Sequence, residues 1–303
     1  MSLGVSPPRA GRLDWAVDGR HWPHRETSRF IRAGGVDWHV QVIGQGPPVL
    51  ALHGAGAASH SWADLATALS GRFSVIVPDL PGHGFSAPAP GHALPLADAA
   101  RAVAALLAAL GTQPRLAIGH SAGAAILARM SLDARPETTA LDGIVGVNAA
   151  LVPFRGVPGL VLPVMARLLH WNPLAAPLLA TAAIDPNAVP GMIRGTGSRI
   201  GAEGLALYRR LFRAPSHVAG TLAMIANWDL APLLADLPRL RPPLLLISGS
   251  RDLAVPPRQA REIAARLPSA KIVGLEGLGH LAHEEAPEQV AHQIRIFADR
   301  LGL

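Results

Sequence analysis

Short apolar runs of strand length alternate along this chain with longer runs of helical composition, and this alternation constrains the fold more than any other feature. The expected strands are residues 28–33, 36–43, 49–52, 73–77, 116–118, 144–147, 244–248 and 271–275. Parallel strands that pair with each other must be joined by crossover connections, which are usually helices. The order therefore predicts an α/β protein with a mostly parallel eight-stranded sheet and helices on both faces.

The alternation stops after the sixth expected strand and resumes near residue 244. The intervening residues 149–228 are rich in proline and glycine, and we expect irregular backbone there with short helical pieces. An excursion of about 80 residues is too long for an ordinary connection. The sequence thus predicts a core made of residues 1–148 and 229–303, with residues 149–228 inserted as a helical cap.

The composition removes several classes of function. Half of the chain is apolar and 16% is charged, so a sizeable core is available. The absence of cysteine excludes disulfides and a thiolate nucleophile. The net charge is +6, but no arginine cluster is interleaved with aromatic residues, so no nucleic-acid partner is expected. Since neither a full ligand set nor a phosphate-binding loop is recognisable, we expect no metal and no cofactor.

Two segments bear on the location of the protein. Residues 1–19 contain two prolines and two acidic residues but no apolar centre of a secretory signal. The longest apolar zone, residues 156–184, is interrupted by Arg167, His170 and four prolines, unlike a spanning helix of about 20 apolar residues. We expect a cytoplasmic protein, either free or peripheral to the inner or photosynthetic membrane.

A candidate nucleophile stands in the sequence Gly119-His120-Ser121-Ala122-Gly123, between an expected strand and an expected helix. In a nucleophile elbow the turn is so tight that the flanking positions carry almost no side chain, and the serine oxygen projects above the sheet. A plain turn of small residues is the alternative, because the chain has 31 glycines. The position between strand and helix favours the nucleophile.

A serine nucleophile needs a base, and the base needs a carboxylate that orients it. Asp252 follows the expected strand 244–248, and His280 follows the expected strand 271–275. Carboxyl ends of parallel strands meet at one edge of the sheet, where such sheets bind ligands. The order Ser121, Asp252, His280 therefore predicts a catalytic triad, against the alternative that both later residues are ordinary polar loop residues.

Three other residues compete for these roles. His283 lies farther from the strand end than His280, and His120 flanks the serine inside the elbow. Asp142 precedes its strand and would lie at the opposite edge of the sheet. His280-x-x-His283, followed by two glutamates, resembles part of a metal site, but a full ligand set is lacking.

An acyl-transfer site also needs donors for the oxyanion that forms during attack. The backbone N–H of Ala122 at the start of the helix is one candidate. The turn His53-Gly54-Ala55-Gly56 follows a strand and offers the N–H of Ala55 as a second, although a simple glycine turn is the alternative. We expect a structural hydrogen-bonding role for His53.

Several blocks of the sequence resemble the α/β-hydrolase superfamily: LALHGAG, VPDLPGHGFS, GHSAG, GSRDLAVP and GLGHLAHEEAPEQV. More narrowly, WPHRETSRFIRAGGVDWHVQ and the following GPPVLALHGAGAASHSWADL resemble the magnesium-chelatase accessory proteins of bacteriochlorophyll biosynthesis. The resemblance implies the α/β-hydrolase fold, the same triad and a cap after the sixth strand. An aspartate at position 121 would suggest a dehalogenase or an epoxide hydrolase, and serine argues against both.

Two hypotheses about function follow, because one fold supports many activities. The first is a serine hydrolase that cleaves an ester or related acyl bond of a bulky apolar substrate, linked to magnesium-porphyrin chemistry. The second is a non-catalytic protein that binds a tetrapyrrole, or assists magnesium chelatase, through the same pocket. In both cases we expect Trp228 and Met165 to line the pocket.

The predicted cap is basic. It holds two acids, Asp185 and Glu203, which leaves +5 of the chain's net +6 in this segment. Its seven arginines are residues 155, 167, 194, 199, 209, 210 and 213. One interpretation is a solvated outer face. Two others are a slot in which arginines converge on a flat carboxylate-bearing molecule, and an apolar ridge with surrounding arginines that docks on an anionic membrane.

Overall fold

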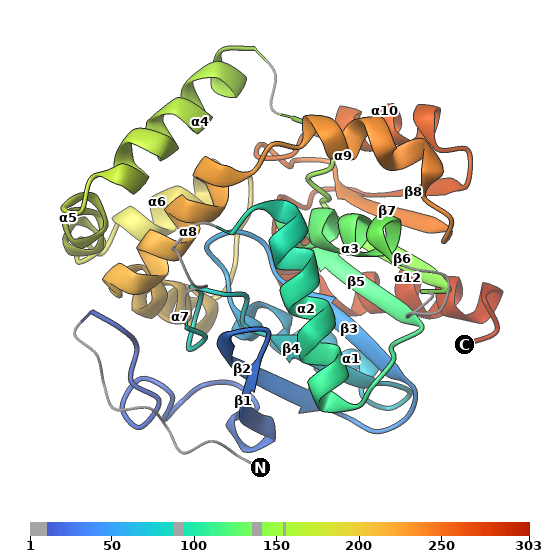
Figure 1. Ribbon diagram of the computed structural model, residues 1–303, viewed down its shortest axis with the longest axis horizontal. Helices are drawn as coiled ribbons and strands as arrows, with labels where there is room; N and C mark the ends of the chain where they lie inside the picture. Colours follow the sequence, from blue (N-terminus) through green and yellow to red (C-terminus); the bar gives the residue numbers. More distant parts are fainter. Residues whose placement is uncertain (1–10, 88–93, 135–140, 154–155) are drawn as a thin grey trace.

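The computed structural model describes residues 11–87, 94–134, 141–153 and 156–303, so Arg155 lies outside the described residues. One sheet runs through the centre of the molecule (Figure 1). Its spatial order is β1-β2-β4-β3-β5-β6-β7-β8, and β2 alone runs opposite to the other strands. The strands are β1 (Ser28–Ala33), β2 (Val36–Ile43), β3 (Pro48–Leu52), β4 (Ser74–Pro78), β5 (Leu116–His120), β6 (Gly143–Val147), β7 (Leu244–Gly249) and β8 (Ala270–Leu275). The predicted mostly parallel eight-stranded sheet is confirmed.

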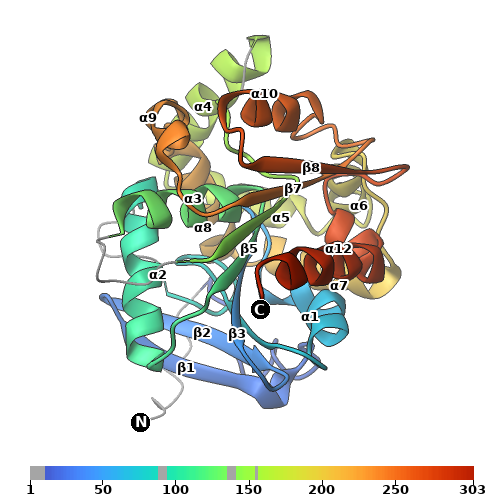
Figure 2. The same ribbon diagram turned by 90° about the vertical axis from the view of Figure 1, so that its right-hand side faces the viewer.

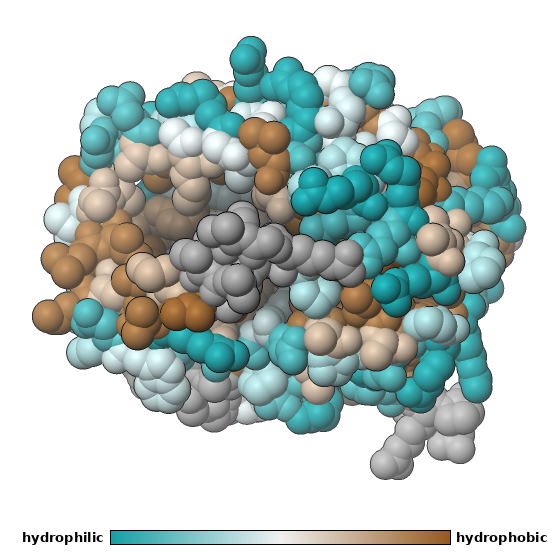
Figure 3. Space-filling model, turned by 90° about the horizontal axis from the view of Figure 1, so that it is seen from above, coloured by the Kyte–Doolittle hydropathy of each residue, from teal (hydrophilic) through white to brown (hydrophobic). Residues whose placement is uncertain are grey.

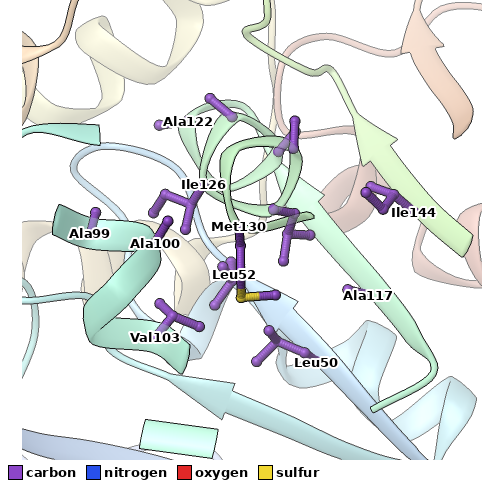
Figure 4. Close-up of a cluster of buried hydrophobic side chains, with 14 of the residues drawn as sticks. Leu50, Leu52, Ala99, Ala100, Val103, Ala117, Ala122, Ile126, Met130 and Ile144 are labelled. Carbon is purple, nitrogen blue, oxygen red and sulfur yellow. The ribbon is translucent and has the colours of Figure 1, made fainter. Parts of the chain in front are cut away.

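Helices cover both faces of this sheet (Figure 2). Side chains alternate between the faces along a strand, so Leu50 and Leu52 of β3 point into one core and Val49 and Ala51 into the other. Figure 4 shows the first core, where β3 and β5 pack against α2 (Leu96–Leu110) and α3 (Ala122–Asp133). On the second face lie α1 (Ala63–Leu69) and α12 (Pro287–Arg300). The remaining core helices are α9 (Ala231–Asp236), α10 (Arg258–Arg266) and α11 (Ala282–Glu285), with 3₁₀ turns at Arg25–Thr27, Ser59–Trp62 and Leu237–Arg239.

Six α-helices lie between β6 and β7, and we call the first five of them the cap helices (Figure 1). They are α4 (Gly156–Trp171), α5 (Ala175–Ala182), α6 (Ala188–Gly195), α7 (Ala202–Phe212) and α8 (Pro215–Asn227). The expected helical pieces are present in residues 149–228, and they are longer and more regular than the proline and glycine content suggested. Pro158, Pro177, Pro190 and Pro215 each lie in the first turn of a helix. The missing N–H is harmless in a first turn, so these prolines mark helix starts instead of breaks.

Within the described ranges, no single helix combines the length and apolarity needed to cross a membrane. Only one bent pair, Pro215–Asn227 with Ala231–Arg239, passes the same test of length and composition, and its two halves are inclined by 57°.

Candidate active site

Ser121 occupies a tight turn between β5 and α3. Its backbone has φ 49° and ψ −115°, a conformation that residues with a side chain rarely adopt. The turn needs glycine on both sides of the serine. A Cβ atom on Gly119 would lie 2.4 Å from the nitrogen of Ala124, and one on Gly123 would lie 2.1 Å from the oxygen of Leu52. The backbone thus has the shape of an elbow that presents Ser121 at the carboxyl end of β5.

We expect Gly123→Ala to lower the free energy of unfolding by about 1–3 kcal/mol or more, because the new methyl group overlaps a backbone oxygen in a packed region. Gly191→Ala is the matched control, since Gly191 is also helical and a Cβ there would meet no atom within 4 Å. That change is expected to stabilise the protein by roughly 0.5–1 kcal/mol. Urea denaturation of both variants tests this, and equal effects would contradict the steric argument.

Asp252 and His280 are joined directly. Nδ1 of His280 donates to Oδ2 of Asp252 at 2.8 Å. The carboxylate is buried, and its other oxygen accepts the backbone N–H groups of Ala254 and Val255, each at 2.8 Å. The His280 side chain keeps 11% exposure. Among the described residues no hydrogen bond joins its Nε2 to Ser121 Oγ, so the contact between serine and histidine stays a prediction.

Asn148 is a site residue that sequence reasoning missed. Its Nδ2 donates to Oδ2 of Asp252 at 2.6 Å and lies 3.3 Å from the carbonyl oxygen of Gly279. The amide therefore ties the loop of the carboxylate to the loop of the histidine. Asn148 has φ 47°, a left-handed conformation that asparagine tolerates better than most residues. An asparagine directly after the apolar strand β6, at the edge that carries the other candidates, was the available signal.

The turn after β3 lies against the elbow. A Cβ atom on Gly54 would be 3.0 Å from the Cβ of Ser121, so only glycine allows this approach. The N–H groups of Ala55 and Ala122 donate to no other described residue. His53 is fully buried and has the structural role expected: its Nδ1 donates to the Gly54 oxygen at 2.8 Å, and its Nε2 accepts the Leu80 N–H at 2.9 Å. The turn can thus hold donors near the serine.

The loop between α6 and α7 touches both loops that carry the acid and the histidine. The carbonyl oxygen of Thr196 accepts the N–H of Leu253 at 3.1 Å, and Oγ of Ser198 accepts the N–H of Leu281 at 2.8 Å. These contacts connect the cap helices to the candidate site. They were not apparent in the sequence, because a threonine and a serine in a polar loop resemble any solvated turn.

The glutamates that resemble metal ligands in the sequence have other partners. Oε1 of Glu285 accepts the N–H of Gly279 at 2.8 Å, and Glu284 accepts the hydroxyl of Tyr208 at 2.7 Å. Burial raises the pKa of Glu284 to about 8. The part of the chain that the structure describes contains no group of three or more histidine, cysteine, aspartate or glutamate residues that could hold a metal ion.

The rival residues lie where they do not contact Asp252. Nε2 of His120 lies 2.9 Å from the carbonyl oxygen of His280 and so supports that loop. His283 is fully buried beside the His120 ring, at 4.4 Å between ring centroids, and its ring nitrogens form no hydrogen bond with described residues. Asp142 precedes β6 and pairs with Arg115, at the start of β5. Of these three histidines, only His280 forms a hydrogen bond with the Asp252 carboxylate among the described residues.

Buried histidines surround the site. Burial lowers the pKa of His53 and His283 to about 3 and that of His60 and His83 to about 4. The same cause holds the pKa of His120 and His217 well below the usual value. Several of these rings touch, as in the pairs His53–His83 and His83–His217, whose centroids are 5.3 and 5.2 Å apart. The imidazoles are therefore neutral at neutral pH.

The two expected pocket residues lie in different surroundings. Met165 is on α4 and is 46% exposed. Trp228 follows α8, packs against the core that contains Ala122, and donates its indole N–H to the carbonyl oxygen of Leu94 at 2.8 Å. That both line a substrate pocket stays a prediction.

Comparison with known proteins identifies the family of this chain. Residues 49–293 match the model of the alpha/beta hydrolase family, so the chain belongs to that family. Among curated proteins it is 41% identical to the magnesium-chelatase 30 kDa subunit of Rhodobacter capsulatus, over 90% of this chain and 95% of that protein. It is 26% identical to haloalkane dehalogenase 2 of Mycobacterium tuberculosis, over 93% and 98% of the two chains.

Solved structures show the same fold. An esterase from Thermogutta terrifontis has a TM-score of 0.69 at 24% identity, over 88% of this chain and 94% of that chain. An enol-lactonase from Burkholderia xenovorans has a TM-score of 0.70 at 23% identity, over 89% and 99%. The neighbours thus include enzymes that act on esters and lactones, while the magnesium-chelatase subunit leaves the activity of this chain open.

Proposed function

We propose that this protein is a serine hydrolase that cleaves an ester or related acyl bond of a bulky apolar substrate. The observation that carries the proposal is the 2.8 Å hydrogen bond from His280 Nδ1 to the buried Asp252, at the sheet edge where Ser121 occupies its elbow. A carboxylate that binds Nδ1 leaves Nε2 as the basic nitrogen of the imidazole, which is the form that a general base requires.

In this mechanism Oγ of Ser121 attacks the acyl carbon while Nε2 of His280 accepts the hydroxyl proton. The N–H groups of Ala55 and Ala122 donate to the oxyanion of the tetrahedral intermediate. When the intermediate collapses, the proton on His280 passes to the leaving alkoxide and an acyl-serine ester remains. Water then attacks that ester with His280 again as base, which releases the acid and restores Ser121.

The substrate class is inferred from the residues around the site. Trp228, which follows the cap helices, supplies apolar surface against the core that contains Ala122, the neighbour of Ser121. Position 121 is serine, which supports acyl transfer through an acyl-enzyme instead of the dehalogenase chemistry named for the Mycobacterium relative. A bulky apolar acid or alcohol is the substrate that such a pocket would accept.

A second function is favoured by one observation, the 41% identity to a magnesium-chelatase subunit over nearly the whole chain. In that case the protein holds a tetrapyrrole or contacts magnesium chelatase, and the Asp252–His280 pair serves as a polar wall of the binding pocket. The two functions differ in whether Ser121 reacts.

Labelling with a fluorophosphonate probe separates them, because the probe reports an activated serine without a known substrate. We expect the wild-type protein to label at one site and Ser121→Ala not to label. Ser70→Ala is the matched control, since Ser70 directly follows α1 and its hydroxyl donates to the carbonyl oxygen of Thr67 in that helix. That variant is expected to label as wild type.

Absence of labelling in the wild type, under conditions in which a known serine hydrolase labels, would overturn the proposed hydrolase. Saturable quenching of tryptophan fluorescence by protoporphyrin IX in the same preparation would then support the binding function. Labelling that persists in Ser121→Ala would show that another serine reacts.

A further inference from the structure

The outer side of the cap helices exposes large apolar side chains. We call the following eight residues the apolar ridge: Val164, Met165, Leu168, Trp171, Leu174, Leu178, Leu179 and Ile184. Their exposure ranges from 40% for Leu179 to 78% for Trp171. Soluble monomers rarely expose large contiguous apolar patches unless the patch binds something.

The ridge follows from how α4 and α5 pack. Val164, Met165, Leu168 and Trp171 share one side of α4 because residues three, four and seven positions apart lie on the same face. The other side of α4 faces α8: Ala166 is buried, and Nε of Arg167 donates to the carbonyl oxygen of Ala226 at 3.1 Å. α5 packs on both α4 and α8. Figure 3 shows hydrophobic side chains gathered on the left of the molecule, the side on which α4 and α5 project in Figure 1.

Positive charge borders the ridge. Guanidinium groups of Arg209 and Arg213 donate to the carbonyl oxygens of Pro186 and Ile184, at 3.0 and 3.5 Å, where the ridge ends. Arg194 lies on α6 two residues after Met192, which is 42% exposed. In the described part of the chain, none of the six cap arginines 167, 194, 199, 209, 210 and 213 forms an ion pair with a carboxylate. Their charge is thus available to an anionic partner.

We propose that the apolar ridge docks on the surface of an anionic lipid bilayer. A projecting ridge of aliphatic side chains with one tryptophan suits the boundary between headgroups and acyl chains, where tryptophan is favoured. The arginines that border the ridge would bind lipid phosphates, because a guanidinium group can donate two parallel hydrogen bonds to one phosphate. Arg209 and Arg213 also line a hollow with Arg12, but Asp18 and the first residues of the described chain share its lining.

The cap helices that carry the ridge are joined to the sheet beside the candidate site. The N–H of Ala150 donates to the carbonyl oxygen of Ser121 at 3.1 Å, and α4 begins at Gly156, a few positions further along the chain. The chain that leads from β6 to α4 thus contacts the elbow. Docking itself does not depend on the reactivity of Ser121.

Co-sedimentation with phosphatidylcholine vesicles, with and without phosphatidylglycerol, tests the proposal on the full chain. We expect the wild type to bind the vesicles that contain phosphatidylglycerol, with a blue shift of tryptophan fluorescence and weaker binding at high salt. The ridge variant Leu168→Ser/Trp171→Ser/Leu178→Ser is expected to bind about tenfold more weakly or worse, because the apolar anchor is lost. Arg209→Gln/Arg213→Gln is expected to lose the preference for the anionic lipid.

The matched control removes three exposed apolar side chains that lie elsewhere, Val17→Ser/Leu253→Ser/Ile272→Ser. It is expected to bind vesicles as wild type. No binding by the wild type, or equal binding by the ridge variant, would overturn the proposal. The wild type could instead self-associate in sedimentation equilibrium without binding vesicles. If the ridge variant then stays monomeric, the ridge binds a second copy of the chain and the proposal is overturned. Ser121→Ala is expected to bind vesicles as wild type. The docking proposal is therefore tested by vesicle binding, and the hydrolase proposal is tested separately by probe labelling.

Discussion

Replacing Ser121 by alanine is expected to lower kcat for a short-chain ester by about 10⁵- to 10⁶-fold, as for a serine triad that loses its nucleophile. His280→Ala is expected to lower kcat by a similar factor, because the serine hydroxyl needs the imidazole to take its proton. The double variant should be no worse than either single one, since the two residues act as a unit. Steady-state kinetics on the three variants measures this.

His292→Ala is the matched control, because His292 is exposed on α12, and it is expected to keep wild-type kcat. The free energy of unfolding of Ser121→Ala should stay within about 1 kcal/mol of wild type, since the hydroxyl forms no hydrogen bond with a described residue. If the double variant loses kcat by the product of the two single factors, Ser121 and His280 act independently, and the prediction is contradicted. If His280→Ala retains activity, another histidine acts as the general base.

Acid is expected to unfold the protein near pH 5 because six histidines are buried in neutral form. Their folded pKa values are lowered, so each histidine contributes stability that is complete above the unfolded pKa of 6.5 and is lost as the pH falls toward the folded value. At pH 5.5 the six together reduce the free energy of unfolding by about 8 kcal/mol relative to pH 8.

Glu284 opposes this trend in part. Its folded pKa of about 8 lies above the unfolded value of 4.5, so its contribution to stability is complete below pH 4.5 and is lost as the pH rises through 8. The contribution of Glu284 to the free energy of unfolding therefore rises by about 3 kcal/mol when the pH falls from 8 to 5.5. The net loss is about 5 kcal/mol, comparable to the whole stability of many domains.

Urea denaturation at intervals between pH 8 and pH 5 measures the effect. His60→Phe removes one titrating ring from between Trp22 and Tyr208, where neither ring nitrogen has a partner among the described residues. It is expected to recover about 1 kcal/mol at pH 5.5 relative to wild type, and His292→Ala should recover nothing. Stability that stays constant down to pH 5 would contradict the burial of these rings as neutral groups.

The sheet was predictable from the sequence because its strands are short apolar runs bounded by glycine, proline and polar residues. β3, β5 and β7 each appear within two residues of the expected bounds. The cap helices were not predictable in the same way. Prolines near residues 158, 177, 190 and 215 resembled breaks, and which of them open a helix depends on packing that the local pattern does not encode.

The candidate site shows the same division. Ser121, Asp252 and His280 could be predicted as one site because each follows a strand, and strand ends converge in any parallel sheet. Asn148 follows a strand as well, yet an amide has no place in the expected triad and so escaped notice. Ser198 and Glu285 hold the loops of Asp252 and His280 through backbone N–H groups. No periodicity or spacing marks such contacts, since they exist only once distant loops have met.

The ends of the cap segment leave and re-enter the sheet at adjacent strands, because β6 and β7 pair directly, with Ile144 opposite Leu244 and Val147 opposite Ile247. An inserted segment whose two attachment points are neighbours behaves as a cassette: its length and sequence can change without altering the register of a single strand. In a lineage of such proteins, substrate preference can therefore diverge quickly in the cassette while the residues at the strand ends stay in place. Exchange of residues 156–227 between relatives is the engineering route that this architecture opens.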